Sequence, residues 1–168
     1  MPFSLIPTWR TLSVTDISAE FLQAEQIRLL MLDFDNTLLP YTTNSPSKAV
    51  LAWLDRMKQN GITVCIVSNS KRGRVPEFCR TYGLDCITRA KKPSVKGIRK
   101  CLRRYYVPAE QALLAGDQIY TDTLGGNRAG VRTVLVKPIN NHNIWLKLRH
   151  IAEKPFIYAA RNRRLPNG

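Results

Sequence analysis

Acidic residues are scarce in this sequence. Its 168 residues include 12 aspartates and glutamates against 26 lysines and arginines, which gives a formal net charge of +14. Residues 1–60 carry five basic and six acidic residues, whereas residues 61–168 carry 21 basic and six acidic ones. Such an excess attracts a polyanion, either nucleic acid or an anionic membrane. A basic surface that serves only solubility is the alternative.

Long apolar runs are also missing. The longest comprise about four residues, such as 29–32, whereas a membrane span needs about 20. Arg10 is the only basic residue near the N-terminus and no apolar stretch follows it, so no signal peptide is expected. The composition, 44% hydrophobic and 23% charged, excludes disordered, collagen-like and coiled-coil chains. We expect a cytoplasmic protein whose only membrane contact is peripheral, at the inner face.

Cysteines and histidines are few and are not spaced as metal ligands. The four cysteines contain no Cys-x-x-Cys pair, and the two histidines lie elsewhere. The sequence therefore predicts no zinc site and four reduced, structural thiols. The residues concerned are Cys65, Cys79, Cys86, Cys101, His142 and His150.

Short apolar runs alternate with helical patterns along the chain. The pattern predicts strands over residues 28–34, 62–67, 86–88, 112–115 and 131–136. It predicts helices from Ser45-Pro46 to Gly61, over 75–82, over 94–106 and from about 122. Strands joined by single helices form a parallel sheet with helices on both faces. We expect one α/β domain over residues 1–168, a doubly wound parallel sheet. Its core would span about 13–138, and a basic, helical tail about 140–168.

Polar residues follow several of the predicted strands. In a parallel sheet such positions meet at the carboxyl edge, where ligands bind. They are Asp33, Asp35 and Thr37, then Ser68 and Asn69, then Lys91, Lys92 and Pro93 ahead of a helix, and finally Gly116, Asp117, Thr121 and Asp122.

These residue types together favour phosphoryl transfer. Carboxylates in one crevice repel one another unless a cation lies among them, and oxygen ligands with open positions suit magnesium. A lysine and a serine there can bind phosphoryl oxygens. One carboxylate can attack phosphorus to form an aspartyl-phosphate, while a second protonates the leaving alcohol and then deprotonates water. The sequence thus predicts metal-assisted hydrolysis of a phosphate ester.

Four motifs in this order resemble those of haloacid dehalogenase (HAD) superfamily phosphatases. They are Asp33-x-Asp35-x-Thr37, Ser68 after the next strand, a lysine ahead of a helix, and Gly116-Asp117-x-x-x-Thr121-Asp122. The resemblance implies the Rossmann-like HAD fold, a Mg²⁺ cofactor and an aspartyl-phosphate intermediate.

The resemblance also implies roles for the carboxylates. Asp33 would be the nucleophile and a metal ligand. Asp35 would be the general acid and base, with its backbone carbonyl on the metal. Asp117 would complete the metal site, and Asp122 would support it.

The remaining motif residues would bind the phosphate or shape the site. Ser68 would bind a phosphoryl oxygen, and Thr37 would steady the nucleophile loop. Lys92 is the better match to the family lysine, with Lys91 as the competing choice. Asn69 would lie near the phosphate or the substrate entrance.

The spacing of the motifs leaves no room for a cap domain. Asp33 and Ser68 are 35 residues apart, Ser68 and Lys92 are 24 apart, and Lys92 and Asp117 are 25 apart. A strand–helix–strand unit alone uses about 30 residues. The site should therefore be open, which suits a phosphate carried on a protein, a nucleic acid or a lipid.

A closer resemblance is to the capless YqeG-like group of subfamily IIIA. It rests on Val14-Thr15-Asp16-Ile17, on residues 33–39, on Ala90-Lys91-Lys92-Pro93 and on residues 116–130. Relatives of that group are phosphatidylglycerophosphate phosphatases, so the resemblance implies an anionic phospholipid substrate. Two alternatives remain: a phosphatase for a polynucleotide end or a phosphoprotein, and a basic nucleic-acid-binding module with a vestigial site.

Eight basic residues and no acidic ones lie between Arg89 and Arg104. At helical spacing, five of them fall on one face, opposite a face that should pack on the sheet. The exposed face would contact an anionic membrane, or else it is simply solvated. Its residues are Lys96, Arg99, Lys100, Arg103 and Arg104, opposite Val95, Ile98, Leu102 and Tyr105.

Overall fold

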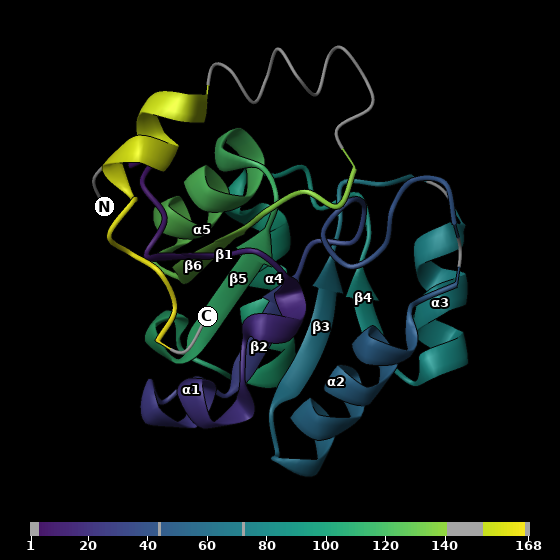
Figure 1. Ribbon diagram of the computed structural model, residues 1–168. Helices are drawn as coiled ribbons and strands as arrows, with labels where there is room; N and C mark the ends of the chain where they lie inside the picture. The colour runs from purple at the N-terminus through teal and green to yellow at the C-terminus, as the bar shows by residue number, and fades with distance from the viewer. Residues whose placement is uncertain (1–3, 44, 72, 141–152, 167–168) are drawn as a thin grey trace.

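Six parallel strands form one open sheet in the computed structural model, which describes residues 4–43, 45–71, 73–140 and 153–166 (Figure 1). Their order across the sheet is β1-β6-β5-β2-β3-β4. The strands are β1 (Trp9–Thr11), β2 (Leu29–Leu32), β3 (Thr63–Val67), β4 (Asp85–Ile87), β5 (Ala112–Gly116) and β6 (Arg132–Val136). The predicted doubly wound parallel sheet is confirmed.

Helices cover both faces of this sheet (Figure 1). Side chains of α1, α2 and α3 pack with Leu30 and Leu32 of β2, while those of α4 pack with Leu29 and Met31 on the opposite face. Successive side chains of a strand point to opposite faces, so the apolar run of β2 serves both layers. The helical elements are η1 (Val14–Asp16), α1 (Ala19–Ala24), α2 (Lys48–Gln59), α3 (Arg74–Tyr82), α4 (Val95–Tyr105), η2 (Ala109–Gln111), the π-helical turn η3 (Ile119–Thr123) and α5 (Leu124–Ala129).

The central strands end at the same level. Leu32 lies opposite Ile66 of β3 and opposite Ala115 of β5. The N–H of Asp33 then donates to the carbonyl of Ala115 at 2.8 Å, which continues the pairing by one residue. The residues that follow β2, β3 and β5 are therefore held along one edge of the sheet.

Strand β1 was not predicted from the sequence. It has three half-buried residues and no apolar alternation, and it pairs with β6 through Trp9 opposite Val134. On the other side of β1, the N–H of Arg10 donates to the carbonyl of Arg163 at 2.8 Å, and the N–H of Leu165 donates to the carbonyl of Arg10 at 3.2 Å. Hydrogen bonds on both sides hold this segment in an extended conformation. Its local sequence alone does not favour a strand.

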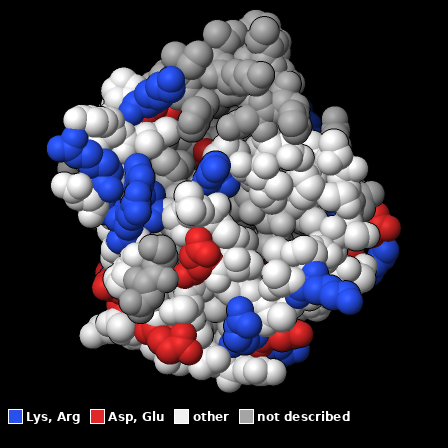
Figure 2. Space-filling model, in the orientation of Figure 1, with Lys and Arg blue, Asp and Glu red and all other residues white. Residues whose placement is uncertain are grey.

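The tail predicted to be helical lies partly within the described residues. Residues 153–159 form a helix, and Leu165 beyond them is buried in the core. Lysine and arginine side chains gather over this segment, at the upper left of Figure 2. Residues 141–152, which include both histidines, lie outside the described residues.

Two predicted helix boundaries differ from the structure. Helix α2 begins at Lys48 rather than at Ser45-Pro46, because the Ser47 hydroxyl accepts from the N–H of Val50 and caps the helix there. Helix α5 begins at Leu124, since the η3 turn occupies the residues around Asp122.

The cysteines are free thiols, and Cys65, Cys79 and Cys101 are buried, as expected of structural residues. Among the described residues, no helix has both the length and the apolar character that crossing a membrane requires.

Helix α4 approaches the loop before it so closely that position 97 has room only for glycine. A Cβ on Gly97 would lie 2.6 Å from the Cβ and 2.7 Å from the carbonyl oxygen of Ala90. Alanine gains about 1 kcal/mol in helix propensity, but overlap with packed backbone costs about 1–3 kcal/mol.

We expect Gly97→Ala to lower the free energy of unfolding in urea. Gly73→Ala, with no atom within 4 Å of the new Cβ, is the control and should change it little. Equal stabilities of the two variants would contradict this reading.

Candidate active site

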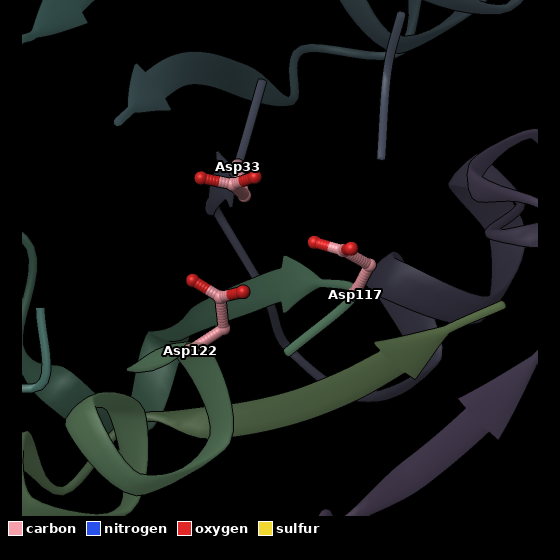
Figure 3. Close-up of side chains that lie close together, drawn as sticks. All are labelled: Asp33, Asp117 and Asp122. Carbon is pink, nitrogen blue, oxygen red and sulfur yellow. The ribbon is translucent and has the colours of Figure 1, made fainter. Parts of the chain in front are cut away.

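Three buried carboxylates face one another at the carboxyl edge of the sheet (Figure 3). Asp33 follows β2, Asp117 follows β5, and Asp122 belongs to η3. One oxygen of each lies within 4.8 Å of an oxygen of the other two. Since all three are buried, water screens their mutual repulsion only weakly.

Lys92 supplies the positive charge among these carboxylates. Its Nζ lies 2.6 Å from Oδ1 of Asp33 and 2.6 Å from Oδ1 of Asp122, and its side chain is 1% exposed. Lys91, the competing candidate, is exposed. The structure thus places Lys92, and not Lys91, against the carboxylates. One ammonium group leaves a net negative charge when all three carboxylates are ionised.

The burial of these charges shifts the pKa values of Asp33, Asp117 and Lys92. Burial raises the pKa of Asp33 to about 7. Burial, followed by the charges of Asp122 and Asp33, raises the pKa of Asp117 to about 8. Burial opposes the charge on Lys92 as well, but Asp122 and Asp33 hold its pKa above the usual value. A divalent cation would relieve the repulsion, and carboxylate oxygens are the ligands that magnesium prefers, so these residues fit such an ion.

The nucleophile loop is tied to its surroundings by Thr37 and Asn36. The Thr37 hydroxyl donates to Oδ1 of Asp117 at 3.3 Å. Asn36 is fully buried with a left-handed φ of 67°, a conformation that asparagine tolerates better than most residues. Its side-chain amide donates to the carbonyl of Asn140 and accepts from the N–H of Asn140, both at 2.9 Å. The loop is therefore fixed to the segment that follows β6.

Asp35 points to a different partner from the other acidic residues. Its Oδ1 accepts from Nη1 of Arg74 at 2.9 Å, and Nη2 of Arg74 donates to the carbonyls of Pro40, at 2.6 Å, and Thr43. The guanidinium also lies 5.0 Å from the centre of the Phe34 ring. Arg74 thus joins the acid/base candidate to the loop over 40–43.

Arg74 was not predicted as a site residue from the sequence. Arg74 begins helix α3. A basic residue in the first turn of a helix opposes the helix dipole, but Lys48 in α2 and Lys96 in α4 also lie in a first turn, so this pattern did not distinguish Arg74.

Ser68 and Asn69 lie at the end of β3, beside the loop that carries Lys92. Ser68 is buried, and its hydroxyl accepts from the N–H of Ser70 at 3.0 Å. The Asn69 side chain donates to the carbonyl of Lys92 at 2.9 Å and accepts from its N–H at 2.7 Å. Asn69 was predicted near the phosphate or the entrance. In the structure its amide holds the backbone of the residue that carries the ammonium group.

Gly116 provides the space that Asp122 occupies. A Cβ on Gly116 would lie 2.3 Å from Cγ of Asp122. Asp122 in turn accepts from the N–H of Gln118 at 3.1 Å through Oδ2, which leaves Oδ1 beside Lys92. The glycine of this motif therefore sets the position of one member of the ion-pair cluster.

Glu153 is a second residue that the sequence analysis missed. It is buried, and its Oε1 accepts from the N–H of Ile119 at 2.9 Å, two residues after Asp117. The tail thereby holds the turn that carries Asp117 and Asp122. Glu153 is the only acidic residue after Asp122 in the sequence. An isolated acid in a basic tail was the available signal.

Without bound metal, the protein should lose stability as the pH rises from about 4 to about 8. Asp33 and Asp117 retain protons in the folded state up to about pH 7 and about pH 8, whereas their unshifted pKa is 3.8. The folded state binds more protons in between, so its stability falls as the pH rises. In excess chelator, the expected Tm is higher near pH 5.5 than near pH 8.5.

Two comparisons isolate this effect. Asp117→Asn removes one titrating group and should narrow the Tm difference between the two pH values, whereas Asp55→Asn on the exposed side of α2 should not. Saturating Mg²⁺ should raise the Tm most near pH 8.5, because a metal ion competes with protons for these oxygens. If Asp117→Asn and Asp55→Asn showed the same difference in Tm between the two pH values, the raised pKa would not belong to Asp117.

Comparisons with known proteins point in one direction. The HAD-hydrolase-like family model matches residues 89–154. The probable phosphatase YqeG of Bacillus subtilis (strain 168) is 35% identical over 127 residues, which cover 76% of this chain and 74% of that protein.

Two solved structures share the fold at low sequence identity. The 4-nitrophenylphosphatase of Thermotoga maritima has a TM-score of 0.58 at 13% identity, covering 73% of this chain and 90% of that one. The magnesium-bound HAD-hydrolase YfnB of Bacillus subtilis has a TM-score of 0.51 at 15% identity, covering 70% and 90%. The extended match to YqeG leads to one assignment. The chain belongs to the YqeG-like group of HAD-superfamily phosphatases.

Proposed function

We propose that the protein hydrolyses a phosphate monoester through an aspartyl-phosphate on Asp33, with Mg²⁺ as cofactor. The observation that carries the proposal is the position of Lys92, whose ammonium group bridges Asp33 and Asp122 beside Asp117. Asp33 and Asp117 would hold the ion with their side chains, and Asp35 with its backbone carbonyl. When bound, the ion would neutralise phosphoryl oxygens and polarise phosphorus.

Asp33, Asp35, Lys92 and Ser68 would carry out the remaining steps of the reaction. A carboxylate oxygen of Asp33 attacks phosphorus, and the bond from phosphorus to the leaving oxygen breaks as Asp35 gives that oxygen a proton. Asp35 then takes a proton from water, which attacks the aspartyl-phosphate and releases inorganic phosphate. Lys92 and the Ser68 hydroxyl bind the phosphoryl oxygens throughout.

The proposed substrate is phosphatidylglycerophosphate at an anionic membrane surface. Within the described residues no separate domain covers the carboxyl edge of the sheet, which suits a phosphate presented on a large surface. Helix α4 starts two residues after Pro93 and carries five exposed basic residues. Among the residues that the structure describes, only Arg104 of these five forms an ion pair, with Asp85 at 3.6 Å. The basic face of α4, Lys96, Arg99, Lys100, Arg103 and Arg104, is available for anionic headgroups.

Asp33→Asn should abolish turnover, because the substitution removes the attacking oxyanion and a metal ligand together. The expected loss in kcat for an aryl phosphate is several orders of magnitude. Asp35→Asn should be comparably slow in turnover yet should accumulate phosphoenzyme from an aryl phosphate, whose leaving group needs no proton. Radiolabelled phosphate trapped on the acid-quenched protein measures the intermediate. Asp55→Asn is the matched control. Near wild-type turnover in Asp33→Asn would exclude the mechanism.

Replacing Arg99, Lys100 and Arg103 by glutamine should weaken binding to anionic vesicles. Each basic residue near anionic lipid contributes about 1 kcal/mol before screening, so the triple variant should bind at least tenfold more weakly in a sedimentation assay. It should also slow hydrolysis of the lipid phosphate more than hydrolysis of a soluble aryl phosphate.

A second triple variant controls for net charge alone. Lys48, Arg56 and Lys58 are exposed on α2, on the opposite face of the sheet. Their replacement by glutamine removes the same charge and should leave vesicle binding closer to wild type. Equal losses in the two variants would mean that the surface charge acts without a specific face. Unchanged binding in the α4 variant would favour a polynucleotide or phosphoprotein substrate instead.

A further inference from the structure

A cavity lies beside Asp117, between the sheet and the C-terminal segment. It has a volume of about 290 Å³. Its walls come from β1, from β6 and the residues after it, and from the helix over 153–159. We call it the tail cavity. No role assigned above uses it.

The tail cavity borders the proposed reaction centre at Asp117. Asp117 contributes to its wall, and the same Asp117 accepts the hydrogen bond of Thr37 in the nucleophile loop. Glu153, also in the wall, holds the turn after Asp117 through the N–H of Ile119. Asp117 therefore belongs both to the wall of the tail cavity and to the carboxylate cluster.

The walls of the tail cavity have an apolar part, three basic residues and the two buried acids Asp117 and Glu153. Leu135 and Val136 of β6 are buried, and Ile157 of the tail helix faces the same space. Arg10, Lys137 and Arg164 also line the cavity, and none of them forms an ion pair with any residue that the structure describes. An apolar wall with unpaired bases fits a group that is partly apolar and partly anionic.

We propose that the tail cavity binds the part of the substrate beyond the phosphoryl group, and that this substrate is an amphiphilic phosphomonoester. Its apolar chain lies against Leu135, Val136 and Ile157, and a second anionic group lies at Lys137 and Arg164. This subsite rests on the proposed phosphatase function and adds to it a selectivity that does not depend on a membrane. The tail then performs part of the substrate enclosure that a cap would otherwise provide.

A series of soluble substrates separates the cavity from membrane binding. Glycerol 3-phosphate and its monobutanoyl and monohexanoyl esters are assayed with Mg²⁺ below their micelle concentrations. Because a buried methylene contributes about 0.8 kcal/mol, kcat/KM should rise by up to about fourfold for each added methylene until the cavity is full.

Variants of Ile157 test whether the rise in kcat/KM with chain length arises in the tail cavity. Ile157→Asn should reduce the ratio of kcat/KM between the hexanoyl ester and glycerol 3-phosphate at least tenfold. Ile157→Trp, which fills the space without introducing a polar group, should reduce the same ratio, and its Tm shows whether the fold is kept. Ile139→Asn is the matched control, because Ile139 is 47% exposed and does not line the tail cavity. Its ratio should stay at the wild-type value.

The second anionic group is tested with Arg164→Gln against Arg161→Gln. Both arginines are exposed on the tail, but only Arg164 lines the cavity. Arg164→Gln should lower kcat/KM several-fold for dihexanoyl phosphatidylglycerophosphate relative to monohexanoyl glycerol phosphate, and Arg161→Gln should not.

The outcomes distinguish the subsite from the activity itself. Hydrolysis of glycerol 3-phosphate with no dependence on chain length, or with equal effects of the Ile157 and Ile139 variants, would overturn the subsite and leave the phosphatase proposal standing. No hydrolysis of any phosphate ester by the wild-type protein would overturn both. Chain-length dependence that is lost only in the Ile157 variants supports the subsite.

Discussion

The buried contacts of Lys92 with Asp33 and Asp122 are the constraint on which the rest of the site depends. Ionised carboxylates in a low-dielectric interior repel one another unless a cation lies among them, and an ammonium group is costly to bury there without carboxylates. Several otherwise unrelated features follow from holding this lysine in place. Asn69 fixes its backbone, Gly97 lets α4 pack against the loop before it, and Gly116 makes room for Asp122.

The fold and the centre of the site were predictable because both follow from local patterns. Short apolar runs identify strands buried on both faces, and acids directly after such runs must meet at the carboxyl edge. That reasoning predicted that Asp33 and Asp117 lie at one edge, and the resemblance to the family favoured Lys92 over Lys91 as the lysine beside them. Arg74 and Glu153 were missed because neither directly follows a predicted strand, so the argument from strand ends does not apply to them. Strand β1 was missed because its pairing with β6 and with the tail, and not its own apolar pattern, determines it.

Two surfaces now bear on substrate choice, and they lie on different parts of the fold. The basic face of α4 belongs to the helical layer that packs with Leu29 and Met31, whereas the tail cavity lies where β1 and β6 meet the C-terminal segment. In the proposed function the basic face of α4 would bring the protein to an anionic membrane, and in the proposed subsite the tail cavity would select the molecule that reaches Asp33. A substrate that carries its phosphate on a lipid would use both, so the two contributions to selectivity multiply in kcat/KM.

The contacts of the tail with Arg10 have a consequence for how this protein associates. An edge strand normally presents a row of unpaired backbone groups that a strand from another molecule can join. At β1 the N–H and the carbonyl of Arg10 are both taken by residues 163–165, in a parallel bridge between Arg10 and Arg164. Residues 163–165 of the same chain thereby pair with the β1 edge of the sheet. Intermolecular strand addition is blocked at Arg10 and is left to the opposite edge, at β4.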